Sequence, residues 1–261
     1  MKTKISSITG NNFGEFWFLV EKFYHPKYYS KEYPNLLTSF LNRLGAKNVL
    51  DAACGIGFPA MEIVNRGFDL TCSDGNESML GIFKLLAKEK GVDIPIIHSK
   101  WKDLNSILET KFDVVLCLDS SITHVDSWGD SKKLNTDNAR KDILKSLKAF
   151  YALLKPGGYV VIGLGRYAFE KGNEFSIDFG TLEIESVLVR HKWKMKFDHG
   201  LKKRIWTLIT EFNGKINVRE FQSYLLYPDE LESLLKESGF GKVEIQEIQP
   251  GEYDNNFVAK K

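Results

Sequence analysis

The segment with the clearest chemical potential is a glycine turn, DAACGIGFPA, at residues 51–60. Gly55 and Gly57 lie one residue apart, shortly after the apolar run at residues 48–50. A strand that passes through two such glycines into a helix lets a small molecule lie against backbone atoms. The turn therefore predicts a nucleotide-like ligand, for which NAD, ATP and S-adenosylmethionine (SAM) are the candidates.

The residues around the turn narrow this choice. Asp51 ends the first strand immediately before the turn, where its carboxylate would attract an ammonium group and repel a pyrophosphate. The turn lacks the Gly-Lys-Ser/Thr sequence of a triphosphate cradle, which argues against ATP. Asp74 lies where an acidic residue commonly meets ribose hydroxyls, so the turn alone leaves NAD open. Asp51 favours a ligand that carries the amine of an amino acid.

Elements of a parallel sheet surround this turn. Strand-like apolar runs occupy 49–50, 68–72, 94–97, 112–118 and 159–162, and helical spacing covers 59–65, 77–89 and 139–154. Strands that alternate with helices form right-handed crossovers and a sheet covered on both faces. The sequence thus predicts a doubly wound, Rossmann-like α/β fold, with a turn at residues 155–158 that ends the long helix.

The pattern changes over residues 174–223, where polar and apolar residues alternate. Hairpin breaks at 198–200 and 213–214 predict antiparallel strands. A helix over 227–240, a strand over 242–246 and a final hairpin ending at residue 259 are expected to complete a seven-stranded, mostly parallel sheet, with the hairpin closing its edge. We therefore expect four regions: 1–45, 46–173, 174–223 and 224–261.

Composition restricts the class of protein. The chain has 261 residues, is 43% hydrophobic and 27% charged, and has a net charge of +2, which is typical of a globular protein. The sequence has no block of Lys and Arg residues, so no nucleic-acid partner is predicted. The basic, aromatic segment 190–197 is interpreted as a half-exposed strand. The apolar start is short and is interrupted by Glu15, so no signal peptide or membrane partner is predicted, and a cytoplasmic location is expected.

The cysteines predict no metal site. Cys54, Cys72 and Cys117 are scattered through strand-like segments without the spacing of metal ligands. An odd number of cysteines in an intracellular chain favours small buried hydrophobic residues over a catalytic thiol. No metal is predicted.

Four motifs follow one another between about residues 46 and 165: VLDAACGIG, LTCSDGNESML, FDVVLCLDSSITHV and LKPGGYVVI. In this order and spacing they resemble the successive motifs of class I SAM-dependent methyltransferases. Within that superfamily the chain is similar to the glycine and sarcosine N-methyltransferases. The positions that carry this second similarity are 31–33, 74–80, Trp101, 117–118 with His124, and an Arg-Tyr pair at 166–167.

The resemblance implies a set of cofactor-binding residues. They are Asp51, Ala53, Gly55, Gly57, Asp74, Gly75, Met79, Lys100, Trp101 and Leu118. Asp51 would lie near the ammonium group of SAM, and Asp74 would accept hydrogen bonds from its ribose. Met79 and Trp101 would flank the adenine. From the residues alone, Asp74 could instead cap the helix that follows it, and Trp101 could be a core residue.

The resemblance also assigns three residues to catalysis or to the acceptor. Arg166, after the fifth strand, would hold the acceptor's carboxylate, although it could equally be a surface arginine. Tyr24 would supply a lid hydroxyl near the sulfonium methyl. His124 is interpreted either as a structural histidine or as a proton acceptor. Two departures from the family pattern, Ser120 where an Asn is expected and Lys100 before Trp101, concern the substrate more than the cofactor.

Methyl transfer from a sulfonium is an in-line displacement, which needs alignment and desolvation more than it needs a metal or a nucleophile from the enzyme. The predicted function is a SAM-dependent methyltransferase acting on the amine of glycine, sarcosine or a similar amino-acid-like acceptor. The antiparallel segment 174–223 would build the chamber for this acceptor. The alternative is O- or N-methylation of a natural product or another small metabolite. An RNA or protein methyltransferase, an NAD-dependent oxidoreductase and a non-catalytic cofactor-binding module remain as other classes, and a homo-oligomer is compatible with the sequence.

Overall fold

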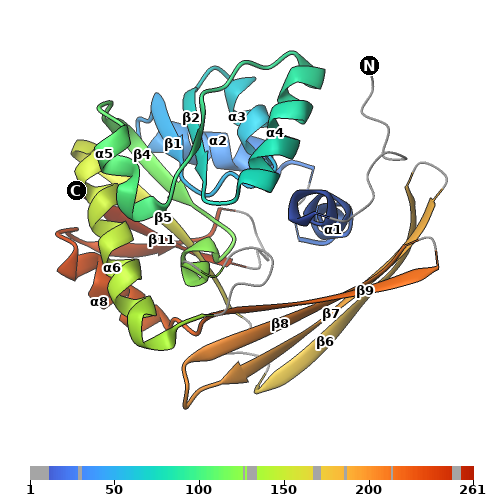
Figure 1. The fold of residues 1–261 in the computed structure, drawn as a ribbon. Coiled ribbons are helices and arrows are strands. Elements are labelled where there is room, and N and C mark those ends of the chain that lie inside the picture. Colours follow the sequence, from blue (N-terminus) through green and yellow to red (C-terminus); the bar gives the residue numbers. More distant parts are fainter. Residues whose placement is uncertain are drawn as a thin grey trace.

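The computed structural model of the chain describes residues 12–28, 31–125, 127, 134–166, 172–184, 187–212, 214–248 and 254–261. These residues form two β-sheets, one with seven strands and one with four (Figure 1). Helices cover both faces of the larger sheet, and most of its strand pairs are parallel. The predicted doubly wound α/β fold with an added antiparallel sheet is confirmed.

The larger sheet has the strand order β10-β11-β5-β4-β1-β2-β3. In that order the strands are Val243–Gln246, Asp254–Lys260, Leu154–Gly165, Phe112–Cys117, Asn48–Asp51, Asp69–Asp74 and Ile96–His98. β11 pairs antiparallel with both β5 and β10, and the pairs among β1 to β5 are parallel. The carboxyl ends of β1, β2 and β4 therefore meet at one edge of the sheet.

The last two strands, β10 and β11, pair antiparallel and lie at one edge of the sheet, where the final hairpin was predicted. β11 lies between β5 and β10, and β10 is the edge strand. Phe257 and Val258 are both buried although they point to opposite faces, which requires an interior strand. Glu244 and Ile245 of β10 are exposed, which suits an edge.

Two layers of helices cover the larger sheet. The helices are α1 (Phe13–Tyr28), α2 (Tyr33–Arg43), α3 (Ala60–Val64), α4 (Glu77–Lys90), α5 (Leu104–Ile107), α6 (Thr136–Leu153) and α8 (Pro228–Glu237), with 3₁₀ turns η2 (Trp101–Asp103) and η3 (Ser121–His124). α2, α3 and α4 share one core with Val49, whereas α5, α6 and α8 share the other with Leu50. Successive residues of β1 thus point into opposite layers. No helix among the described residues is long and apolar enough to cross a membrane.

Residues 155–158 do not form the separate turn that was predicted. α6 ends at Leu153 and β5 begins at Leu154, and the pairing of β5 with β4 shifts register between Phe112 and Val114. The segment is therefore a bulge at the start of the strand. A Cβ on Gly158 would lie 2.9 Å from the carbonyl oxygen of Asp113, so the close approach of the two strands requires glycine there.

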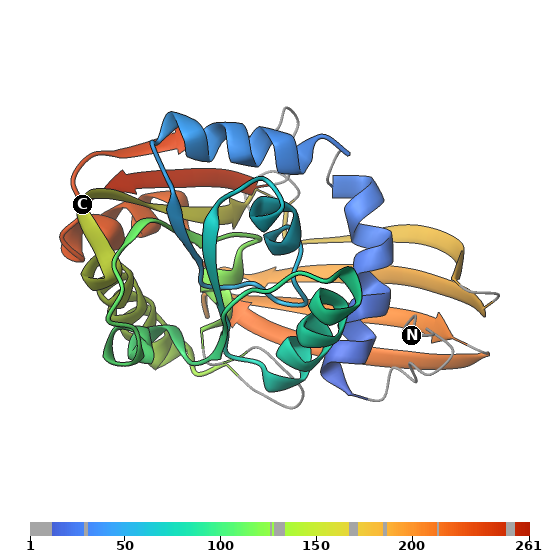
Figure 2. The ribbon, with the colours of Figure 1, turned by 90° about the horizontal axis from the view of Figure 1, so that it is seen from above.

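The second sheet has the order β6-β7-β8-β9, with strands Glu174–Ile184, Val187–Asp198, Lys203–Phe212 and Lys215–Tyr224. All three pairs are antiparallel, and the predicted break at 198–200 is confirmed. The other predicted break, at 213–214, falls between β8 and β9, and residue 213 lies outside the described residues. α1 lies across this sheet (Figure 2) and also contacts α4. Phe16 and Leu19 of α1 share a buried cluster with Trp193 and Trp206 of the sheet. The helix therefore fixes the second sheet against the first.

Candidate active site

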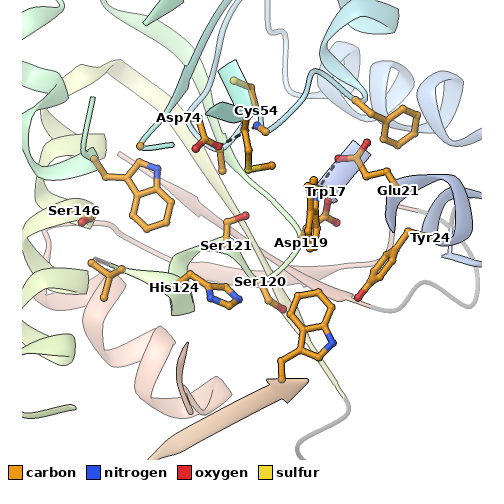
Figure 3. Close-up of a pocket in the computed structure, with 18 of the residues that line it drawn as sticks. Trp17, Glu21, Tyr24, Cys54, Asp74, Asp119, Ser120, Ser121, His124 and Ser146 are labelled. Carbon is orange, nitrogen blue, oxygen red and sulfur yellow. Dashed lines mark hydrogen bonds between the residues drawn. The ribbon is translucent and has the colours of Figure 1, made fainter. Parts of the chain in front are cut away.

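A cavity opens at the carboxyl ends of β1, β2 and β4, where open α/β sheets place their ligands. Asp74 and Cys54 lie on the side of the glycine turn, and Trp17, Glu21 and Tyr24 project from α1 (Figure 3). β7 and β8 of the second sheet contribute further lining. The cavity thus lies between the two sheets and is covered in part by α1.

Nine of the predicted site residues line this cavity. They are Tyr24, Ala53, Gly55, Asp74, Gly75, Met79, Lys100, Trp101 and His124. The lining does not include four others: Asp51, Gly57, Leu118 and Arg166. Asp51, Gly57 and Leu118 are buried beside it, and Arg166 is a half-buried residue directly after β5. The roles predicted for all these residues, the clamp role of Arg166 included, stay predictions.

The glycine turn adopts a backbone that other residues would disturb. Gly55 has φ +54°, and a Cβ there would lie 3.2 Å from Cε of Met79. Gly57 has φ +102°, and a Cβ there would lie 2.4 Å from the ring of Phe83. Positive φ and close packing together require glycine at Gly57. The turn therefore brings bare backbone to the edge of the cavity, as the sequence predicted.

Two buried carboxyl groups flank this turn. Oδ1 of Asp51 accepts a hydrogen bond from the amide of Ala53, 3.1 Å away. Asp74 accepts from the amides of Gly55 (3.0 Å) and Asn76 (2.8 Å). Burial raises the pKa of Asp51 to about 7, and it raises the pKa of Asp74 to about 6 against the effect of these hydrogen bonds. Neither carboxyl has an ion-pair partner among the described residues, so both are suited to a ligand that supplies a cation or hydroxyl donors.

Asp74 does not cap the following helix, which was the alternative prediction for it. The N-cap of α4 is Asn76, whose Oδ1 accepts hydrogen bonds from the amides of Ser78 and Met79. Asp74 instead holds the glycine turn by its bond from Gly55. Each oxygen of its carboxyl keeps a further lone pair for a ligand.

Trp101 and Met79 lie at the cavity and also belong to packed clusters. Nε1 of Trp101 donates a hydrogen bond to the carbonyl oxygen of Ala52, and its ring packs edge-on against Phe150. Met79 is 2% exposed and belongs to the cluster that α1 forms with the second sheet. Trp101 therefore packs against the core and lines the cavity at the same time, so the two interpretations of this residue are compatible.

The loop after β4 has an unusual backbone. Asp119 and Ser120 have φ values of 55° and 56°, which non-glycine residues seldom adopt. Oγ of Ser120 accepts a hydrogen bond from the amide of Gly165 (2.6 Å), and its carbonyl oxygen accepts one from Oγ1 of Thr123 (2.7 Å). These bonds hold the loop so that Asp119, Ser120 and His124 all reach the cavity. Such backbone strain gathers at functional sites.

His124 contacts an arginine from the second sheet. Nη2 of Arg204 donates to Nε2 of His124 (2.8 Å), and because a guanidinium only donates, Nε2 carries no proton. Burial, together with the charge of Arg204, lowers the pKa of His124 well below its ordinary value. His124 is therefore neutral and uses Nε2 to orient Arg204, which favours the structural interpretation of this residue over proton acceptance.

α1 places a carboxyl group in an aromatic wall. Nε1 of Trp17 donates to Oε1 of Glu21 (2.9 Å). Burial, and after it the negative charge of Asp119, raise the pKa of Glu21 to about 8. Nε2 of His25 lies 3.4 Å from Oε2 of Glu21, but burial lowers the pKa of His25 to about 4. At pH 7 both groups are therefore neutral, and the contact is not an ion pair.

Sequence reasoning missed several residues of the cavity: Trp17, Glu21, Trp193, Arg204 and Trp206. A signal existed for some of them. The alternation in β7 and β8 puts Trp193, Arg204 and Trp206 on one face of the sheet, and that face is the buried one. Nothing local in the sequence relates that face to the loop after β4.

The fold and the site define a doubly wound α/β protein that binds a small molecule at the carboxyl ends of its parallel strands. Residues 49–158 match the family model described as a methyltransferase domain. Residues 49–158 thus form a methyltransferase domain, and the resemblance of the four motifs to class I SAM-dependent methyltransferases is confirmed. SAM is the methyl donor of that family.

Individual relatives support the family at different levels. A glycine/sarcosine N-methyltransferase from Aphanothece halophytica is 33% identical over 127 residues, which cover 49% of this chain and 43% of the relative. The matched stretch thus spans less than half of that relative's length.

Solved structures match nearly the whole chain. A SAM-dependent methyltransferase from Clostridium acetobutylicum has a TM-score of 0.72 at 15% identity, with 95% of this chain and 98% of that chain covered. A SAM-bound amino pentose methyltransferase from Micromonospora echinaspora has a TM-score of 0.68 at 15% identity, with 94% and 96% covered. At these identities the structures support the fold alone.

Proposed function

We propose that the chain transfers a methyl group from SAM to the amine of glycine, sarcosine or a similar amino-acid-like acceptor. The observation that carries this proposal is the pair of carboxyl side chains, Glu21 and Asp119, that line the cavity beside the glycine turn. Aromatic side chains of Trp17, Tyr24 and Trp206 stand around them. Aromatic faces attract an amine in its cationic form, and a carboxyl group attracts it once the carboxyl has ionised.

The residues of the glycine turn fit the cofactor. Asp51 would meet the ammonium group, Asp74 with Gly75 would meet the ribose, and Met79 and Trp101 would meet the adenine. The desolvation of Asp51 and Asp74, which raises the pKa of each, is consistent with carboxyl groups that a ligand's donors complete. When bound, SAM supplies an electrophilic methyl group on a sulfonium.

The remaining work belongs to the chain's own side chains. An amine can accept a methyl group only as the free base, so a group near it must take a proton. Glu21, with its pKa raised to about 8, becomes such a base when it ionises. The aromatic rings around it exclude water, and Tyr24, which lines the same wall, would orient the acceptor through its hydroxyl.

A second candidate is N-methylation of a larger natural product, such as an amino sugar. The face of the second sheet favours it, because Trp193, Met195 and Trp206 give the cavity an apolar wall larger than a small amino acid needs. The amino pentose methyltransferase that shares this fold is consistent with it.

A transfer assay separates the two candidates. The purified protein is incubated with labelled SAM and either glycine, sarcosine, amino sugars or simple amines without a carboxylate, and S-adenosylhomocysteine (SAH) formation is measured. Turnover of glycine or sarcosine, lost in Glu21→Gln, supports the proposal. Turnover of amino sugars alone moves the assignment to the second candidate, and SAH binding without any turnover contradicts both.

A further inference from the structure

The side chain of Arg204 enters the cavity from β8, on the sheet that the cofactor motifs do not include. We propose that Arg204 binds the carboxylate of the methyl acceptor, so that the acceptor is an amine that also carries a carboxylate and not an amine without one. This inference rests on the proposed function and adds a substrate class to it. Arg166, the clamp predicted from the sequence, is the competing residue for this role.

Three hydrogen bonds fix one edge of the guanidinium. Nε donates to Oγ of Ser223 (2.7 Å), and Nη2 donates to Oγ1 of Thr123 (2.9 Å) and to Nε2 of His124 (2.8 Å). These bonds use every hydrogen of Nε and Nη2. The orientation of Arg204 is thereby set by β9 and by the loop after β4, before any ligand binds.

The other edge of the guanidinium is available to a ligand. No described residue accepts a hydrogen bond from Nη1, although Arg204 as a whole is only 8% exposed. Nη1 is also absent from the buried polar atoms that lack a partner in the described structure, so it keeps access to the cavity. Its two hydrogens can therefore donate to an oxygen anion that enters there.

The charge of Arg204 has no counter-ion of its own. No carboxylate of the described residues lies within 4.0 Å of the guanidinium, although Glu21 and Asp119 line the same cavity. A buried charge is costly when nothing pairs with it, and removing water strengthens its attraction for an anion. The fixed orientation, the accessible Nη1 and the missing counter-ion together describe a preformed anion site.

Two ligands could supply the anion, because SAM also carries a carboxylate on its methionine part. The placement favours the acceptor. Arg204 is hydrogen-bonded to η3 and β9, whereas the residues predicted for the cofactor's methionine part, Asp51 and Gly55, lie at the end of β1 and in the turn after it. Trp206 on the same strand and Trp193 on the neighbouring β7 also line the cavity on this sheet.

The test measures anion binding without requiring turnover. Calorimetric titrations with acetate, and with acetamide as its neutral match, are run on the wild-type protein with and without saturating SAH. The variants are Arg204→Met, Arg204→Lys, Arg166→Met and Arg190→Met. Arg190 is the matched control because it lies on the outer face of the same sheet, 53% exposed and paired with Asp178, so its loss removes the same charge outside the cavity.

We expect Arg204→Met to weaken acetate binding roughly 10- to 100-fold, the range for a hydrogen bond to a charged group, while acetamide binding changes little. Arg204→Lys should lie between the wild type and Arg204→Met, and Arg190→Met should match the wild type. SAH affinity should be unchanged in all of these variants. With active enzyme, glycine should lose the same factor in kcat/KM in Arg204→Met, whereas glycinamide should not.

Three results would overturn the inference. If acetate still binds Arg204→Met but no longer binds Arg166→Met, the carboxylate-binding role belongs to Arg166. A fall in SAH affinity in Arg204→Met equal to the fall for acetate would assign the anion to the cofactor. Equal losses for acetate and acetamide would reduce Arg204 to a structural link between the sheets. Failure of SAH to bind the wild type would instead contradict the proposed function, and the titrations without SAH would still test Arg204.

Discussion

Replacing Asp51 with Asn should stabilise the protein and weaken its grip on the cofactor. The side chain is 3% exposed and accepts one hydrogen bond, from the amide of Ala53. Asn keeps the shape and an oxygen for that bond but removes the charge. The variant therefore isolates the cost of holding an ionised carboxyl in this position.

The size of the effect follows from the pKa. Burial, and secondarily the charge of Asp74, raise the pKa of Asp51 from 3.8 to about 7. Each pKa unit corresponds to about 1.36 kcal/mol, so the ionised form costs the folded state about 4 kcal/mol above pH 7. The folded protein binds this proton more tightly than the unfolded chain, so the cost is absent below 3.8 and grows until the pH passes 7. Between about pH 5 and about pH 8.5 it grows by roughly 3 kcal/mol.

Urea unfolding of the wild type, Asp51→Asn and Asp93→Asn at about pH 5 and about pH 8.5 tests this expectation. Asp93 is exposed and serves as the control for loss of one carboxylate. Asp51→Asn should exceed the wild type in stability by roughly 3 kcal/mol more at the higher pH than at the lower, and its SAH affinity should fall roughly 10- to 100-fold. An advantage of equal size at both pH values would refute the assigned pKa, and unchanged SAH affinity would remove Asp51 from the cofactor site.

Three further perturbations test other parts of the site. Gly57→Ala should destabilise the protein by roughly 3 kcal/mol in urea unfolding, because the new Cβ would meet the Phe83 ring. Gly45 also has positive φ but open space around it, so the control Gly45→Ala should cost only about 1 kcal/mol. Equal losses in the two variants would contradict the packing argument. Glu21→Gln should abolish a rise in kcat/KM that levels off near pH 8, and a profile that keeps this inflection would exclude Glu21 as the base. Ser120→Ala should cost about 1 to 3 kcal/mol of stability, since the amide of Gly165 loses its acceptor, and a neutral result would mean that water replaces the hydroxyl.

The cavity residues near the glycine turn were predictable because their determinants are local. The glycine turn, Asp51 and Asp74 lie within 24 residues of one another, and each sits at the end of a strand that the apolar pattern identifies. Parallel strands place their carboxyl ends at one edge, so sequence position translates directly into spatial position. Met79 and Trp101 follow from the same rule, one element further along.

The cavity residues on α1, on the loop after β4 and on the second sheet were harder to predict as a group because their determinants are distant in sequence. Arg204 meets His124 across 80 residues, and Glu21 feels Asp119 across almost 100. Alternation shows that Arg204 and Trp206 share a face of β8, but the partner of that face is decided by how the second sheet docks on α1. In the sequence, Glu21 looks like an ordinary polar residue of a surface helix. Only the structure shows that it is buried and that its pKa is raised.

The two sets of charges differ in a way that bears on the ligand. Carboxyl groups gather around the glycine turn and α1, whereas the guanidinium of Arg204 comes from the opposite sheet, and no described ion pair joins them. An ion pair within the cavity would offset part of the desolvation cost of the guanidinium and of the carboxyl groups. The described residues form no such pair, which stability alone would favour. Separated charges retain that cost until a ligand bearing an amine and a carboxylate spans the gap. If the proposed function holds, a zwitterionic acceptor would satisfy both sites in one binding event, which a neutral sugar or a simple amine would not.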